Sequence, residues 1–313
     1  MMEKILVVAK KEIIENLKSI RFWGLIALFV LFYIASTYAV GFALRGFGGL
    51  VPTGRQRVVL QLSSNVAGAF NYIAPLLGIA LGFGAIAAER EKGTIRLVLS
   101  RPIYRDDLIN GKMIAAALLI LLALGLSTLI AMPTAVVLQG ITVTAEDFVR
   151  LLLLLLPATL LAFAYYSLAL FASVNSSRSS HALVFSLVLW IFFSFVLPLL
   201  ASFIAFYMLG PPPAISFRFN ATRPFQPGQE PTQLREYYQK YSQITSTIQL
   251  ISPNARFQSL SQALFALRQQ TSAYEELGAV LLNRWIDIVI PAVYIAVFTL
   301  LSYLVFLRKQ ETR

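Results

Sequence analysis

The sequence contains no cysteine and only one histidine, His181. Disulfide bonds and thiolate metal sites are therefore excluded, and a histidine cluster for a metal ion cannot form. Charged residues are also scarce, at 13% of the chain against about 25% in soluble proteins. The chain has no phosphate-binding GxxxxGK loop, no HExxH zinc motif and no nucleophile elbow. We therefore expect no catalytic, cofactor-binding or metal site in this chain itself.

Hydrophobic residues make up 58% of the sequence and fall into blocks of twenty or more. A helix needs about twenty such residues to cross a hydrocarbon core of roughly 30 Å. We therefore predict an all-α membrane protein with six transmembrane helices. Their approximate ranges are 22–44, 66–88, 113–138, 149–174, 182–209 and 285–307. The first five would form one domain over 22–209, and the sixth would lie in 285–313 with a polar tail.

Residues 1–21 have a different pattern from these blocks. Leu6, Ala9, Ile13 and Leu17 repeat every three or four residues, whereas lysine and glutamate occupy much of the rest. This spacing predicts an amphipathic helix with one apolar face. Charges interrupt the helix too often for a secretory signal peptide, so we expect it to lie at the membrane interface.

Lysine and arginine predict the orientation in the membrane. They gather in the N-terminal segment, in the connection between the second and third spans, and in the C-terminal tail. Short loops rich in these residues stay in the cytoplasm. We therefore predict a multi-pass protein of the cell membrane with both termini in the cytoplasm, which requires an even number of spans.

The net charge of +11 follows from the same arrangement. Clustered basic residues can bind nucleic acid, because they neutralise phosphate groups. Here they lie at the ends of the apolar blocks, where they would instead meet the headgroups of membrane lipid. We therefore expect contact with lipid and no nucleic-acid partner.

The region 210–284 is predicted to be extracellular. It opens with three prolines, continues as a polar stretch to about residue 231 and then becomes helical in pattern. Leu260 and Leu264 belong to a series of apolar residues at helical spacing, which predicts a helix or helical pair over 255–282. We expect this helical elaboration to rest on the outer membrane surface or the mouth of the bundle.

Two smaller patterns concern helix packing. Gly78 and Gly82 in the second span allow a neighbouring helix to approach closely. Packing inside the bundle is the favoured interpretation, and a dimer interface is the alternative. Prolines within the spans, such as Pro75 and Pro198, are interpreted as packing kinks and less often as gating hinges.

The segment 89–112 carries the most specific signal. A run of charges is often only a solvated surface, but here the order of residues is distinctive. The pattern consists of Glu89 at the end of a span, the pair Gly93 and Thr94, the apolar run Leu97, Val98 and Leu99, then Pro102, and finally Gly111 and Lys112. This segment resembles the type-two ABC exporter permease family. The overall layout resembles it too, including the turn at Ser252, Pro253 and Asn254.

The resemblance implies a membrane-spanning permease subunit of an ATP-binding cassette exporter. A separate ATP-binding subunit would hold ATP and magnesium, and residues 102–111 would form a coupling helix that docks in its groove, beside an elbow helix at 1–20. The implied coupling residues are Glu89, Gly93, Thr94, Pro102, Tyr104, Arg105, Asp106, Asp107 and Lys112, of which Tyr104 to Asp107 would contact the groove. The chain would act as a homodimer, or as a heterodimer with a paralogous permease.

Two other functions remain open at this point. One is a membrane enzyme acting on lipid or a lipid-linked glycan, with its site among the carboxylates of 210–284, which include Glu230, Glu236, Glu275 and Glu276. Its weakness is that these carboxylates lack metal or histidine partners. The other is a scaffold or sensor that binds an ATPase without transporting anything. The sequence does not name a substrate.

Overall fold

The computed structural model describes residues 2–46, 55–94, 105–139, 144–213, 232–266 and 274–308. The regular elements in these ranges are helices. They are α1 (Met2–Leu17), α2 (Ile20–Gly46), α3 (Arg55–Gly82), α4 (Ala87–Glu91), α6 (Arg105–Gln139), α7 (Ala145–Asn175), α8 (Ser179–Ile191), the π-helix η1 (Phe192–Val196), α9 (Leu197–Leu209), α10 (Thr232–Ile248), the 3-10 helix η2 (Gln249–Ile251), α11 (Pro253–Leu264), α12 (Leu277–Asn283) and α13 (Trp285–Arg308).

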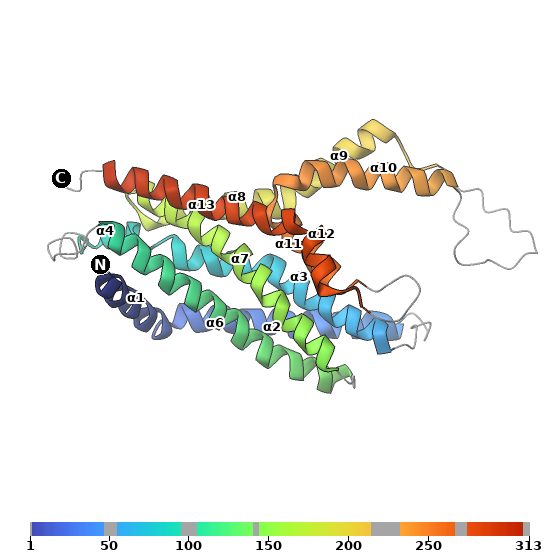
Figure 1. Ribbon diagram of the computed structural model, residues 1–313, viewed down its shortest axis with the longest axis horizontal. Coiled ribbons are helices and arrows are strands. Elements are labelled where there is room, and N and C mark those ends of the chain that lie inside the picture. The colour runs from blue at the N-terminus through green and yellow to red at the C-terminus, as the bar shows by residue number, and fades with distance from the viewer. Residues whose placement is uncertain are drawn as a thin grey trace, which may run out of the picture.

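The long helices run side by side along one axis (Figure 1). Among the residues that the structure describes, five segments are long and apolar enough to cross a membrane, namely Val66–Glu91, Arg105–Ile130, Ala145–Asn175, Ser179–Leu209 and Trp285–Arg308. A sixth is reached if α1 and α2, which meet at a bend of 63°, count as one crossing. The all-α membrane class predicted from the sequence is therefore confirmed. The α1 helix and the C-terminal end of α13 lie at the same end of the bundle (Figure 1).

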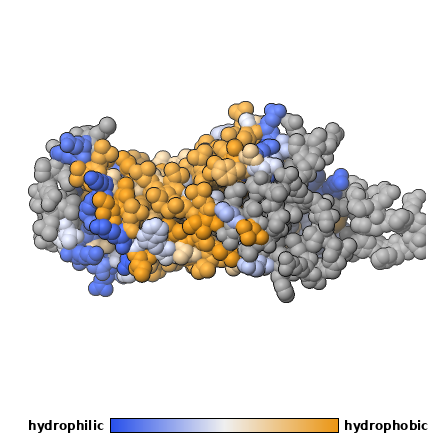
Figure 2. All heavy atoms as spheres, turned by 90° about the horizontal axis from the view of Figure 1, so that it is seen from below, coloured by the Kyte–Doolittle hydropathy of each residue, from blue (hydrophilic) through white to orange (hydrophobic). Residues whose placement is uncertain are grey.

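The outside of the bundle is apolar. Figure 2 shows a broad belt of hydrophobic side chains along the middle, with hydrophilic side chains gathered at the end that holds α1 and α4. On α13, Val293, Val297, Leu300 and Leu304 are exposed and follow one another at helical spacing. Such a stripe would be unfavourable in water, so it is the surface that lipid would cover.

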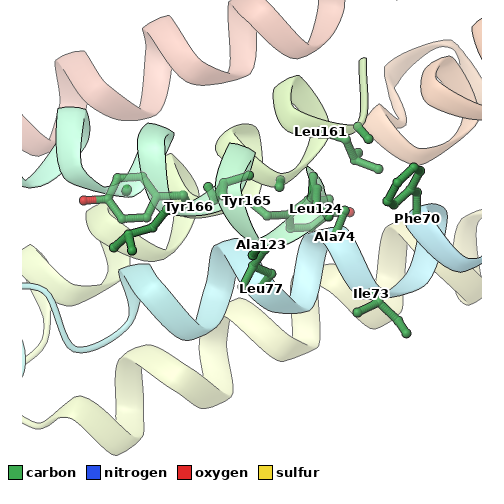
Figure 3. Close-up of a cluster of buried hydrophobic side chains, with 14 of the residues drawn as sticks. Phe70, Ile73, Ala74, Leu77, Ala123, Leu124, Leu161, Tyr165 and Tyr166 are labelled. Carbon is green, nitrogen blue, oxygen red and sulfur yellow. The ribbon is translucent and has the colours of Figure 1, made fainter. Parts of the chain in front are cut away.

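The closest helix contact lies between α3 and α7. A Cβ atom on Gly78 would lie 2.0 Å from the carbonyl oxygen of Ala162, and one on Gly82 would lie 2.7 Å from that of Tyr166. The two glycines therefore let the two backbones touch. Around this contact, Tyr165 and Tyr166 lie among buried residues of α3 and α6 (Figure 3). The interpretation of the glycine pattern as packing within the bundle is confirmed.

The fifth span is bent from an ideal helix by η1. Pro198 has no N–H group, so it cannot donate the usual helical hydrogen bond to residue 194. The widened π-helical turn at Phe192–Val196 directly precedes this proline, at the start of α9. Pro198 therefore explains why the regular α-helix is interrupted in this span.

The helical pair predicted over 255–282 is present as α11 and α12. The α11 helix does not lie on the lipid surface, because Phe257, Leu260 and Leu264 are buried and the helix packs on α3, α7 and α13. At its start, the amide of Asn254 donates to the backbone oxygen of Asn71 at 2.8 Å. The side-chain oxygen of Asn254 accepts a hydrogen bond from the hydroxyl of Tyr165. We call 210–284 the outer region, after its predicted location. Its helix α11 is thus fastened inside the bundle.

The contact between α3 and α7 gives a first test. In Gly78→Ala the new methyl group collides with the backbone of α7, and such overpacking costs about 1–3 kcal/mol. We expect a lower melting temperature and more aggregated protein in size-exclusion chromatography of the detergent-solubilised chain.

The matched control is Gly68→Ala on the same helix. A Cβ atom at Gly68 would have nothing within 4 Å, so this variant should be as stable as the parent or slightly more stable. Equal behaviour of the two variants would show that α3 and α7 do not touch at Gly78.

Candidate functional site

Three helices meet at the side chain of Lys112. Its Nζ atom lies 2.6 Å from Oε1 of Glu12 on α1 and 2.8 Å from Oε1 of Glu89 on α4, while Lys112 itself begins the third turn of α6. The lysine side chain is 3% exposed, and the two glutamates are 16% and 14% exposed. Breaking a buried pair of this kind leaves an uncompensated charge, which is strongly unfavourable. One ammonium group therefore holds α1, α4 and α6 together.

The neighbouring glycine explains how α1 comes so near. A Cβ atom on Gly111 would lie 2.6 Å from Cβ of Val8 and 2.9 Å from the carbonyl oxygen of Ile5. Ile5, Val8 and Glu12 share one face of α1, because they follow one another at intervals of three and four residues. The Gly111–Lys112 pair thus supplies both the space for α1 and the charge that binds it.

A break in the second span places Glu89. The helix α3 ends at Gly82 and α4 begins at Ala87, and the N–H groups of Ile86 and Ala87 at the start of α4 find their partner outside the span. The hydroxyl of Ser173 on α7 accepts hydrogen bonds from the backbone N–H groups of Ile86 and Ala87, at 3.0 and 2.9 Å. A neighbouring serine thus satisfies the interrupted backbone, as broken membrane helices require.

The next two residues of α4 bind the corner between α7 and α8. The guanidinium of Arg90 donates to the carbonyl oxygens of Val174 and Ser176, at the C-terminal end of α7. The carboxylate of Glu91 accepts from the hydroxyl of Ser179 at 2.7 Å, at the N-terminus of α8. Each charge faces the helix end of opposite partial charge, which is favourable. Arg90 and Glu91 thus connect α4 to two further helices.

Gly93 and Thr94 terminate this short helix. Gly93 has a φ of +72°, the left-handed conformation that ends many helices and that glycine adopts without strain. The hydroxyl of Thr94 donates back to the carbonyl oxygen of Glu89 at 3.2 Å. The Gly-Thr pair thus stops α4 directly after its three charged residues.

We call the set Glu12, Glu89, Arg90, Glu91, Lys112, Ser173 and Ser179 the inner junction. Sequence reasoning singled out Glu89 and Lys112 but missed Glu12, Ser173 and Ser179. The signal for Glu12 was its place on the same face of α1 as Val8. Ser173 and Ser179 carried no signal, because single serines near helix ends are common and only the packing shows which backbone groups they serve.

Of the remaining coupling residues, the structure describes those from Arg105 onward. Residues 105–111 are the first turns of α6 and continue directly into the third span, so they are not a separate coupling helix. Pro102 and Tyr104 lie outside the described residues. Asp106 is half-buried in the first turn of α6.

Arg105 and Asp107 are not exposed groove contacts in this conformation. The guanidinium of Arg105 donates to the carbonyl oxygen of Phe306 on α13 at 2.7 Å, because the C-terminal carbonyls of α13 lie beside the start of α6. Asp107 is 1% exposed, and within the described residues neither of its carboxylate oxygens has a hydrogen-bond partner. Its position in the first turn of α6 partly offsets this, since the helix N-terminus favours negative charge.

A second polar cluster fastens the outer region to α7, and we call it the outer anchor. Arg150 is 2% exposed and donates to the carbonyl oxygens of Leu264 and Glu275, at 2.6 and 2.7 Å. Its guanidinium also lies 4.3 Å from the ring centre of Tyr274, whose hydroxyl donates to Asp147. Burial raises the pKa of Tyr274, and the hydrogen bond to Asp147 raises it further. The sequence showed Arg150 only as one basic residue in an outer loop.

These contacts define what the inner junction can do. Lys112 pairs with Glu12 and Glu89, whereas Arg90 and Glu91 bind the ends of α7 and α8. Among the described residues, no three histidine, cysteine or acidic side chains are placed to hold a metal ion. The junction links α1, α4, α6, α7 and α8 at one end of a membrane bundle.

The fold and the junction define a multi-pass membrane protein whose helices are joined at one end by charged contacts. Residues 6–310 match the family model described as ABC-2 family transporter protein. This chain therefore belongs to the ABC-2 transporter family.

Two curated relatives carry the name probable ABC transporter permease protein NosY. The one from Pseudomonas aeruginosa is 31% identical over 196 residues, which is 59% of this chain and 65% of that protein. The one from Stutzerimonas stutzeri is 26% identical over 193 residues, which is 61% of this chain and 67% of that protein. The alignment with the first relative thus spans slightly less than two thirds of its length.

The inner junction gives a second test. Lys112→Met leaves the carboxylates of Glu12 and Glu89 buried without their cation, so we expect the free energy of unfolding to fall by about 3–5 kcal/mol. Lys11→Met is the matched control. Lys11 is 49% exposed and lies 3.8 Å from Glu89, so its loss should change stability by less than about 1 kcal/mol.

Unfolding of the detergent-solubilised chain by denaturant measures both values. The triple variant Lys112→Met, Glu12→Gln, Glu89→Gln should regain much of the lost stability, because it removes the uncompensated charges as well. If Lys112→Met and Lys11→Met lose the same small amount, Lys112 is not buried between the two glutamates.

Proposed function

We propose that this chain is the membrane-spanning permease subunit of an ATP-driven exporter, and that the inner junction couples it to a separate ATP-binding subunit. The observation that carries the proposal is the buried Lys112, which joins α1, α4 and α6. Lys112 belongs to the segment 89–112 that resembles the exporter permeases. ATP and magnesium belong to the partner subunit.

The length of α6 supports this role. Its 35 residues extend over about 52 Å at 1.5 Å per residue, far more than the roughly 30 Å of a hydrocarbon core. Both ends cannot lie within the hydrocarbon. We place the polar first turns, from Arg105 to Lys112, at the cytoplasmic end, where α6 packs on α1 and α13.

The contacts of the junction also suggest how movement passes through the bundle. Displacement of the first turns of α6 pulls on Glu12 and Glu89 through Lys112. Because Arg90 and Glu91 bind the corner of α7 and α8, movement of α4 reaches these helices too. Packed helices move as rigid bodies, so a local push becomes a change in how the spans are arranged.

Two further features complete the proposal. The junction faces the cytoplasm, since α1, the start of α6 and the end of α13 carry the basic residues that short cytoplasmic loops retain.

Two copies of the chain, or this chain and a paralogous permease, surround the substrate pathway. The export direction follows from the resemblance of segment 89–112 to exporter permeases.

The docking of the partner is tested by reversing one charge at each end of the molecule. Lys92 is exposed on the cytoplasmic side of the junction, and Lys240 is exposed on α10 in the outer region. The tagged chain is purified from gently solubilised membranes, co-purified proteins are identified by mass spectrometry, and ATP hydrolysis is measured. We expect Lys92→Glu to lower the recovered ATP-binding subunit and its activity several-fold, because interface charges govern association.

Lys240→Glu is the control and should leave both readings unchanged. A parent chain that purifies without an ATP-binding subunit and shows no ATPase activity contradicts the proposal and favours a membrane enzyme with its site in 210–284. Equal losses in the two variants would place the partner elsewhere than at the inner junction.

A further inference from the structure

A polar cavity lies in the outer region, apart from the inner junction. It has a volume of about 810 Å³, is open to solvent, and is lined by α10, η2, α11 and Arg284 at the end of α12. Serine, threonine and glutamine side chains from α10 and α11 supply much of its lining. None of the described residues that line it is acidic or aromatic. Sites for drug-like ligands are mostly apolar and aromatic, so this composition indicates a small hydrophilic ligand or headgroup.

Two arginines give the cavity its charge. Arg284 is exposed and donates from Nη1 to the hydroxyl of Ser259 at 3.0 Å, which directs its guanidinium along the wall. Arg256 donates from Nη1 to Asp287 at 3.0 Å, and its Nε atom is buried without a hydrogen-bond partner among the described residues. Asp287 offsets the charge of Arg256, whereas Arg284 lies opposite no carboxylate in the lining. The cavity therefore carries a net positive charge and unused donors.

A positively charged cavity favours an anionic ligand, and the position of the cavity relative to the membrane indicates which kind of anion. Arg284 directly precedes Trp285, which is 58% exposed at the first residue of the last span. Tryptophan at the end of a span marks the headgroup layer. Exposed apolar residues adjoin lining residues in the chain: Ile251 follows Leu250, and Leu282 lies two residues before Arg284. A ligand with a polar head and an apolar tail matches the polar lining of the cavity and these exposed apolar residues.

We propose that this cavity binds the phosphate-bearing headgroup of a lipid in the outer leaflet of the membrane. Guanidinium groups bind phosphate oxygens with two parallel hydrogen bonds, and the surrounding hydroxyl and amide groups suit the remaining oxygens of a headgroup. The exposed apolar residues beside the cavity contact the first part of the acyl chains. This site is independent of the coupling proposed for the inner junction.

The test uses the full chain, stripped of lipid in a neutral detergent. Binding of phosphatidylglycerol is followed by native mass spectrometry, and binding of glycerol 3-phosphate by calorimetry. We expect one saturable site for phosphatidylglycerol that Arg284→Gln weakens about tenfold, because a charge-assisted hydrogen bond is lost. Arg235→Gln on α10 removes the same charge from an exposed position outside the cavity and should bind like the parent.

Each outcome decides a separate point. Tight binding of phosphatidylglycerol with weak binding of glycerol 3-phosphate supports a membrane lipid as the source of the phosphate. Equally tight binding of glycerol 3-phosphate keeps the phosphate site but overturns the lipid source. If Arg284→Gln and Arg235→Gln weaken binding equally, or the parent binds neither probe, the cavity is not a phosphate site. Should Arg284→Gln fail to fold, Arg284→Lys and the double variant Ser259→Ala, Gln262→Ala test the same lining.

Discussion

The ammonium group of Lys112 lies in a buried space where a single charge could not remain without partners. Glu12 and Glu89 supply two carboxylates, and each of them belongs to a different helix. The positions of α1, α4 and α6 therefore depend on one another, because moving any of them separates the buried ammonium group from a largely buried carboxylate. Gly111 makes this geometry possible by letting α1 approach within contact distance of α6.

The interruption of the second span extends this dependence to the rest of the bundle. If α3 continued as one helix, the N–H groups of Ile86 and Ala87 would have helical partners and would not bond to Ser173. The break before α4 leaves backbone N–H groups that donate to the hydroxyl of Ser173. It also lets Glu89, Arg90 and Glu91 bind α6, the end of α7 and the start of α8, respectively. A short helix of five residues thereby connects most of one end of the molecule.

At the opposite end of the bundle, polar side chains also hold helices together, but they bind backbone oxygens and amides instead of forming a buried ion pair. Arg150 binds carbonyl oxygens at the end of α11 and at Glu275, and Asn254 bonds with α3 and α7 inside the bundle. The outer region is thus fixed to the same helix, α7, that the inner junction holds at its other end. Because α7 also packs on α3 between these two ends, one helix connects the contacts at both of them.

The sequence by itself determined the all-α membrane class and the approximate ranges of five spans; among the described residues a sixth is present only if α1 and α2 count as one crossing. These follow from local properties, since the length of apolar blocks and the spacing of apolar residues are set along the chain. Gly78 and Gly82 could be assigned to close packing for the same reason, although not to their partner α7.

Only the tertiary structure decided which charges pair. Glu12 is a hundred positions from Lys112, and many other carboxylates could have met that lysine equally well on sequence grounds. The same holds for Arg105, expected at a partner's groove and found on α13. It also holds for α11, expected on the outer membrane surface or at the mouth of the bundle and found packed on α3, α7 and α13. Such contacts depend on how whole helices pack, because the free energy of a buried charge or a broken helix is settled by groups from distant parts of the chain.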